Sequence, residues 1–90
     1  MVPRDFSLSQ NYPNPFNGMT NLEFRAPTTG FVTLKVFDLL GREVAVLVNE
    51  ECRPGEYRVH WDASRLPSGV YFCRLQAHDF LQTKKLILLK

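Results

Sequence analysis

Long apolar runs and an excess of either charge are missing from this 90-residue sequence. The longest C-terminal apolar run, Leu86 to Leu89, is far shorter than the roughly 20 residues of a membrane-spanning helix. Met1 to Gln10 contains no uninterrupted apolar segment of the kind found in signal peptides. The 11 Lys and Arg alternate with 9 Asp and Glu along the chain and leave a net charge of only +2. A spanning helix and a signal peptide are therefore not expected, and so weak a field does not favour nucleic acid as a partner.

Residues that bind metals or carry catalysis are equally scarce. The sequence has 2 histidines and 2 cysteines, and no paired cysteine spacing that would indicate zinc. His60, Asp62 and Ser64 lie on or just after one predicted strand, whereas a catalytic triad needs groups that converge from different elements. No glycine-rich loop precedes a helix, which argues against phosphate binding. We therefore expect no enzyme activity, no cofactor and no metal, with His60 and Asp62 on a solvated strand face.

Turn signals recur at intervals typical of the strands of a β-sandwich. They are Asn17-Gly18, Pro27-Thr28-Thr29-Gly30, Leu39-Leu40-Gly41, Arg53-Pro54-Gly55, Pro67-Ser68-Gly69 and His78-Asp79. Between them apolar and polar residues alternate, and no stretch has a sustained helical period. The pattern predicts an all-β antiparallel sandwich with Trp61 in its core. Its seven strands are expected at about residues 7–12, 20–26, 31–38, 42–48, 55–62, 69–77 and 80–89.

The segment around Pro13 and Pro15 predicts a rigid strap that leads into these strands. Neither proline can donate to a β-ladder, and each holds the residue before it in an extended conformation. Tyr12 and Phe16 are expected to anchor the strap on the domain, and Asn14 can close a local turn. The strap is therefore expected at an edge of the sandwich and not in its centre.

Two turns and one corner have specific predicted geometries. Asp38 and Gly41 suit the first and fourth positions of a type I turn. Pro54 and Gly55 suit the two central positions of a type II turn. Tyr71, near the start of the sixth strand, is expected to donate a hydrogen bond back across a corner, as tyrosines do in sandwich domains. All of these residues are predicted to be structural.

The cysteines are expected to remain two free thiols. Cys73 alternates with inward apolar residues, whereas Cys52 is predicted to lie in the polar loop 49–55. A disulfide needs Cα atoms roughly 4.4–6.8 Å apart, which these two placements do not favour.

The closing strand differs from the others because it is apolar on both faces from Leu86 onward. One interpretation is a buried last strand with Lys84, Lys85 and Lys90 as charged guards against edge pairing. The other is a face exposed for a partner, whose sheet such a strand suits by strand addition. The residues alone leave both open.

Five motifs in a fixed order resemble one protein family. They are Tyr12-Pro13-Asn14-Pro15-Phe16-Asn17, Val32 to Val44 with Asp38 and Gly41, Trp61-Asp62, Leu66-Pro67-Ser68-Gly69-Val70-Tyr71-Phe72, and Lys84-Lys85-Leu86-Ile87-Leu88-Leu89-Lys90. Over these residues, from about Phe6 to Lys90, the chain closely resembles the C-terminal sorting domain of proteins exported by type IX secretion. That family is similar to an immunoglobulin-like sandwich and is related to the domain of flagellar hook-capping proteins. Gly18 departs from the pattern, since many relatives carry another proline there.

The resemblance implies a non-catalytic sorting signal in residues 6–90, with residues 1–5 as a linker or remnant. Its implied partners are the outer-membrane type IX machinery, a sortase-like protease that clips the domain off near its N-terminal boundary, and an upstream cargo domain of the same precursor. The implied destination is the cell surface or the medium, through the periplasm. The alternative is a retained immunoglobulin-like accessory module that binds protein or carbohydrate.

The resemblance also assigns roles to residues. The parts read by the machinery correspond to Gly69, Tyr71, Lys84, Lys85, Leu86, Ile87, Leu88, Leu89 and Lys90. A structural role is implied for Tyr12, Pro13, Asn14, Pro15, Phe16, Asp38, Gly41 and Trp61.

Overall fold

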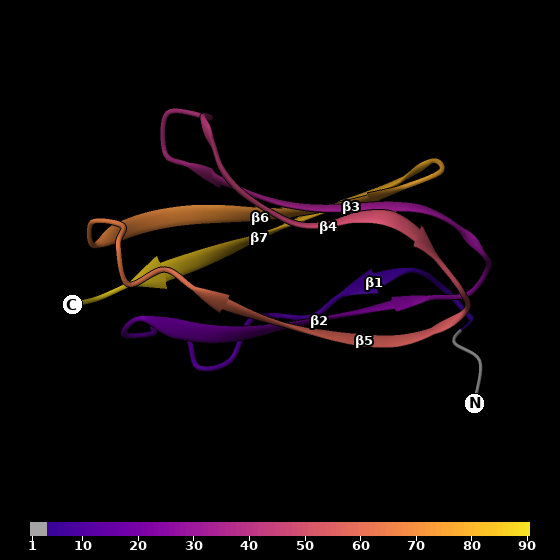
Figure 1. Cartoon of the computed structure of the whole chain (residues 1–90), viewed down its shortest axis with the longest axis horizontal. Coiled ribbons are helices and arrows are strands. Elements are labelled where there is room, and N and C mark those ends of the chain that lie inside the picture. Colours follow the sequence, from indigo (N-terminus) through magenta and orange to yellow (C-terminus); the bar gives the residue numbers. More distant parts are fainter. Residues whose placement is uncertain (1–3) are drawn as a thin grey trace.

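The computed structural model describes residues 4–90 and contains seven β-strands. The strands are β1 (Ser7–Leu8), β2 (Met19–Ala26), β3 (Gly30–Asp38), β4 (Glu43–Cys52), β5 (Gly55–Asp62), β6 (Gly69–Ala77) and β7 (Phe80–Leu88). They form two antiparallel sheets, one in the order β1-β2-β5 and one in the order β4-β3-β6-β7 (Figure 1). The fold is the predicted all-β, immunoglobulin-like sandwich. Within the described residues no helix is long and apolar enough to cross a membrane.

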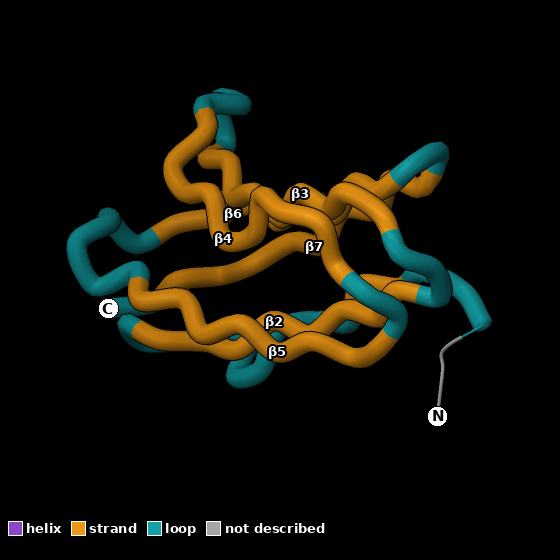
Figure 2. Tube along the Cα trace, turned by 45° about the vertical axis from the view of Figure 1, so that its right-hand side comes forward, coloured by secondary structure: helices purple, strands orange, loops and turns teal. Residues whose placement is uncertain are grey.

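The core lies between the two sheets, because alternate residues of each strand point inward. Figure 2 shows β2 and β5 in one layer and β4, β6 and β7 in the other. The fully buried side chains from the two layers include Leu22, Phe24, Val32, Leu34, Val36, Leu75, Leu86 and Leu88. Trp61 is 6% exposed, which confirms its predicted place in the core. Each such apolar side chain contributes roughly 1.5–3 kcal/mol on burial.

Strand boundaries differ from the prediction by more than one residue in two places. β4 extends to Cys52, although the pattern predicted its end at residue 48. Asn49, Glu50 and Glu51 are exposed and polar, so alternation carries no signal there, yet all three pair with β3. β1 contains only Ser7 and Leu8, although the Ser9 amide still donates to Glu23 of β2 and Tyr12 forms an isolated bridge with Asn21. Side-chain polarity predicts which residues are buried, but it does not predict backbone pairing between exposed residues.

The predicted loop position of Cys52 is wrong, whereas the prediction of two free thiols is confirmed. Cys52 ends β4 and is 5% exposed. It pairs with Gly30 on β3, and Cys73 pairs with Val36. These partners are separated by six positions along one strand, which is roughly 20 Å at 3.3 Å per residue. That separation is several times the span of a disulfide.

The type II turn predicted at Pro54 and Gly55 is also wrong. Gly55 has a φ of +156°, whereas the second central residue of a type II turn has a φ near +80°. β4 and β5 belong to different sheets, and the two residues between them carry the chain from one sheet to the other. A hairpin turn would instead have paired β4 with β5.

Candidate functional site

Three motif segments meet at one end of the sandwich. The tip of the β3–β4 hairpin and the segment that leads from β5 into β6 line a groove of about 510 Å³. The C-terminus lies at the same end, on the left in Figure 1, beside the loop that joins β5 to β6. Residues 38–44, except Gly41, form one wall, and residues 66–71 form the other. We call this groove, with Leu89 and Lys90, the corner surface.

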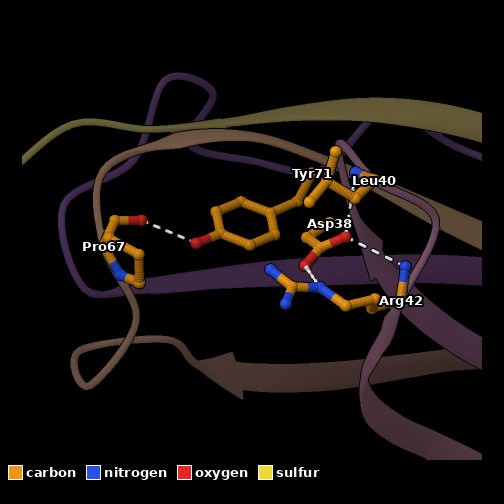
Figure 3. A network of polar contacts seen from close by, with 5 residues as sticks. All are labelled: Asp38, Leu40, Arg42, Pro67 and Tyr71. Carbon is orange, nitrogen blue, oxygen red and sulfur yellow. Dashed lines mark hydrogen bonds and ion pairs between the residues drawn. The ribbon is translucent and has the colours of Figure 1, made fainter.

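The hairpin tip is held by the predicted type I turn, which is confirmed. The Gly41 amide donates to the Asp38 carbonyl at 3.0 Å, and Gly41 has a φ of +84°, a value that favours glycine. One carboxylate oxygen of Asp38 accepts from the amides of Leu40 (3.0 Å) and Arg42 (2.9 Å), and the other accepts from Arg42 Nε at 2.8 Å (Figure 3). The Arg42 amide is the first cause of the lowered pKa of Asp38, although partial desolvation opposes it. The tip is therefore a fixed shape.

This turn displays two leucines that sequence reasoning did not single out. Leu39 and Leu40 are 69% and 78% exposed, and both line the groove. Because the turn is closed by Asp38 and the backbone, the two side chains are free to face outward. Their signal in the sequence was two large apolar residues in the centre of a turn, where polar residues are usual.

Tyr71 forms the predicted corner. Its hydroxyl donates to the carbonyl of Pro67 at 2.6 Å (Figure 3). Its buried ring packs edge-on against Trp61, with ring centroids 6.1 Å apart. Burial is the main cause of the raised pKa of Tyr71, and nearby Asp38 adds to it. Gly69 has a φ of +155°, and the space where its Cβ would lie is open. Glycine is therefore favoured at this position by its positive φ, since an added Cβ would contact no neighbouring atom.

The last residue is fastened to the same corner. The Lys90 amide donates to Ser68 Oγ at 2.9 Å, and Lys90 Nζ donates to the Ser64 carbonyl. The amide of Ser64 in turn donates to Asp62 Oδ1 at 2.9 Å. Hydrogen bonds from Ser64 are the main cause of the lowered pKa of Asp62, so this carboxylate closes a turn. Of the residues considered as a triad, Asp62 and Ser64 therefore shape the loop that holds the C-terminus.

The structure separates the predicted recognition residues into three groups by exposure. Leu86 and Leu88 are fully buried, and Tyr71 is buried beside them in the core. Lys84 and Ile87 are half-buried. Lys85, Leu89 and Lys90 are exposed, together with the partly exposed backbone at Gly69. The buried group gives the corner its shape, and the exposed group is the most accessible to another molecule.

The strap covers the outer edge of β7 near its end. The Phe16 amide donates to the Ile87 carbonyl and the Leu89 amide donates to the Phe16 carbonyl, each at 2.9 Å. Asn14 Oδ1 accepts from the Ile87 amide at 3.0 Å. Phe16 is buried, with its ring 5.8 Å from that of Trp61. This end of β7 therefore has no free backbone edge for strand addition while the strap is in place.

The strap is anchored differently from the prediction. Phe16 is an anchor as expected, but Tyr12 is 78% exposed, so that prediction is wrong for its ring. Tyr12 pairs with Asn21 through its backbone, and the buried Asn11 donates to the Thr20 hydroxyl at 3.0 Å. The Tyr12–Pro13 and Asn14–Pro15 peptide bonds are cis. Backbone pairs and a buried amide hold this part of the strap, because the ring of Tyr12 points to solvent.

No cluster of three or more His, Cys, Asp or Glu side chains able to hold a metal occurs in residues 4–90. His60 and Asp62 are both exposed on β5, as predicted.

The family comparison covers nearly all of the strap, the strands and the corner surface. A family model described as a secretion system C-terminal sorting domain matches residues 10–89 of the chain. No protein in a search of curated sequences matches it.

Proposed function

Because the chain belongs to the family of secretion system C-terminal sorting domains, which serve type IX secretion, we propose that its folded corner surface is the part that the outer-membrane machinery reads. In this proposal the domain performs no chemistry. It presents Leu89, Lys90 and the neighbouring groove in a fixed arrangement, and the machinery binds that arrangement. The exposed residues contact the machinery, and the buried residues hold them in position.

The observation that carries the proposal is the fastening of the chain end. Lys90 is bonded to the loop that precedes Gly69 through both its backbone and its side chain. Residues that follow the last strand of a domain are normally mobile, so this attachment lowers the conformational entropy that a partner must remove on binding. Leu89, beside it, stays exposed. A pre-arranged segment next to an apolar groove suits recognition by a protein surface.

We also propose that the cargo is joined upstream and that a sortase-like protease cuts before Phe6, after which the cargo is released or attached to the cell surface. The described N-terminal end and the C-terminus lie at opposite ends of the long axis, whose extent is 37 Å (Figure 1). A cargo attached at the first end leaves the corner surface open. Arg4 and Asp5 are exposed and lie outside any strand, which gives a protease access.

A secretion assay tests this function. Residues 6–90 are fused behind a signal peptide and a fluorescent reporter in a host with type IX secretion. The parent is compared with Leu89→Ser, with Lys84→Ala/Lys85→Ala and with a version that has polar residues appended after Lys90. We expect the parent to reach the medium or cell surface, and Leu89→Ser and the appended tail to remain in the periplasm. Lys85 is exposed and Lys84 half-buried, so the double change should cost about 1 kcal/mol of stability or less, and a defect in a folded variant would also report recognition.

Leu81→Ser is the matched control for Leu89→Ser. Leu81 is 59% exposed and Leu89 is 55% exposed, and Leu81 lies toward the other end of β7. Both changes remove similar exposed apolar surface, so only loss of a specific contact separates them. If a folded parent fusion stays in the periplasm, the sorting function is wrong. If the parent is exported and Leu89→Ser and the tail are exported equally well, the corner surface is not the part being read.

A further inference from the structure

The outer edge of β5 is an unobstructed sheet edge. β7 is covered by the strap near its end, and β1 has two residues. The pairing of β4 with β3 is interrupted by register shifts, between Leu34 and Lys35 and between Val36 and Phe37 of β3. Short, covered and bulged edges resist the addition of another strand. β5 instead pairs with β2 in one unbroken register over all 8 of its residues.

The direction of the free backbone groups follows from β2. Glu23 accepts a hydrogen bond from the Ser9 amide at 3.0 Å, and Asn21 pairs with Tyr12, so both point away from β5. In an antiparallel ladder neighbouring residues point to opposite sides. Leu22 and Phe24 therefore bond to β5, through their partners Val59 and Tyr57. The amides and carbonyls of Glu56, Arg58 and His60 consequently face the outer edge.

Apolar surface lies open beside this edge. β1 lies against β7, so the order of the sheets places β5 on the side of β4. On that side a set of apolar residues packs against the core but is only half-buried: Val44, Ala45, Leu47, Val48, Tyr57 and Val59. The sheet of β5 has three strands, whereas the facing sheet has four. A further strand beside β5 would cover this surface with its inward side chains.

Charges on the other face define what such a strand must carry. Arg25 Nε lies 3.3 Å from Glu56 Oε1, and Arg58 Nη2 lies 3.4 Å from Glu23 Oε2. A strand on the free edge continues both rows when it places a basic residue opposite Glu56 and an acidic residue opposite Arg58. These two residues must be two positions apart on one face, with apolar residues on the other.

A second copy of β5 meets this requirement only when Tyr57 lies opposite Tyr57, a register that pairs just residues 55–59 and places Pro54, which has no amide to donate, opposite His60. The registers with longer overlap do not meet it. The register that pairs Val59 with Val59 places Glu56 opposite Asp62 and Arg58 opposite His60. Shifting this register by two residues keeps the same side chains on each face and nearly the same overlap, but it places Arg58 opposite Arg58. Like charges directly opposite each other disfavour pairing.

We propose that the outer edge of β5 is a strand-addition site for an extended segment of a partner protein, with an acidic and a basic residue on its outward face and apolar residues on its inward face. This site is separate from the corner surface, and its test does not depend on secretion. Backbone bonds to Glu56, Arg58 and His60 supply affinity, and the two charges and the half-buried apolar residues supply selectivity.

The probe is a synthetic peptide that copies β2 from Thr20 to Ala26, because β2 already has the required pattern: its Glu23 and Arg25 pair with Arg58 and Glu56. Amide hydrogen exchange of the domain is measured by NMR with and without the peptide. We expect slower exchange at Glu56, Arg58 and His60, with Val59 unchanged because its amide already faces β2. A peptide with the acidic and basic residues exchanged is the matched control. It should bind roughly three- to tenfold more weakly, as expected for two exposed ion pairs.

A domain with Glu56→Arg/Arg58→Glu should reverse the preference and bind the exchanged peptide better. Both pairs are exposed, so this variant is expected to fold. Equal affinity for the two peptides, slowing confined to β4 or β7, or no slowing at millimolar peptide would overturn the proposal. So would faster exchange at Leu22 and Phe24, because that result means that the peptide replaces β2 instead of adding to β5. Self-association of the domain with slowing at Arg58 would identify a second copy as the occupant and would also overturn it.

Discussion

The hydrogen bond from Tyr71 to Pro67 should stabilise the corner surface measurably, and Tyr71→Phe tests it. The change removes one hydroxyl and keeps the buried ring that packs against Trp61. A hydrogen bond of this kind contributes about 0.5–1.5 kcal/mol net. Pro67 is exposed, so water can satisfy its carbonyl and the full penalty of a buried orphan group does not apply. We therefore expect a loss of about 1 kcal/mol, or roughly 4–8 °C in Tm.

Tyr57→Phe is the matched control. Its hydroxyl also donates to a carbonyl four residues earlier, that of Arg53, but this bond is exposed. Water replaces such a bond at little cost, so the expected loss is under about 0.5 kcal/mol. Urea unfolding at pH 7, followed by the fluorescence of the single, buried Trp61, measures all three proteins. A loss in Tyr71→Phe no larger than that in Tyr57→Phe would refute a stabilising corner bond.

The same pair has a distinctive pH dependence. Burial raises the pKa of Tyr71 above its ordinary value near 10, so the unfolded chain ionises first as the pH rises. The unfolded state then binds fewer protons than the folded state, and stability falls with rising pH. The parent should therefore lose stability above about pH 10 in a way that Tyr71→Phe does not, and the difference between them should shrink. A constant difference from pH 8 to 11 would contradict this cause of the shift.

Three further predictions concern the turn, the thiols and the strap. Asp38→Asn should be less stable than the parent at pH 7. The difference in stability should vanish on acidification, because a carboxyl pKa lowered by folding gives stability that is lost as the pH falls through the folded-state pKa. A difference that persists at about pH 2 in urea unfolding would contradict this prediction. Cys52 and Cys73 should resist alkylation in the folded domain, where burial raises the pKa of Cys73 to about 12, and should both react after denaturation. A thiol count of zero in denatured, oxidised protein would show a disulfide instead. Asn14→Ala should speed amide exchange at Ile87, whose amide donates to Asn14 Oδ1, whereas the exposed Asn17→Ala should not; equal rates in both variants would mean that the strap does not close the edge of β7.

Local chemistry in the sequence determined much of the fold. Alternation from Val32 to Val36 predicts which face of β3 is buried, because side chains of a strand point to opposite faces in turn. Asp38 and Gly41 specify their turn through hydrogen bonds and backbone freedom within five residues. Tyr71 bonds to a residue only four positions away. Interactions of such short range can be predicted without knowing the rest of the chain.

Only the tertiary structure decided which partners pair with the polar end of β4, with the strap and with the end of β7. Residues 49–51 carry no apolar alternation, so their pairing with β3, and with it the burial of Cys52, left no local signal. The closing strand was apolar on both faces, but which leucine is buried and which is reachable depends on the strap: Phe16 bonds across Ile87 and Leu89 from more than 70 positions away. The open edge of β5 is likewise set by the order of strands in the two sheets. Pairing between distant strands is a choice among backbone partners that are chemically equivalent, so side-chain patterns within one segment cannot specify it.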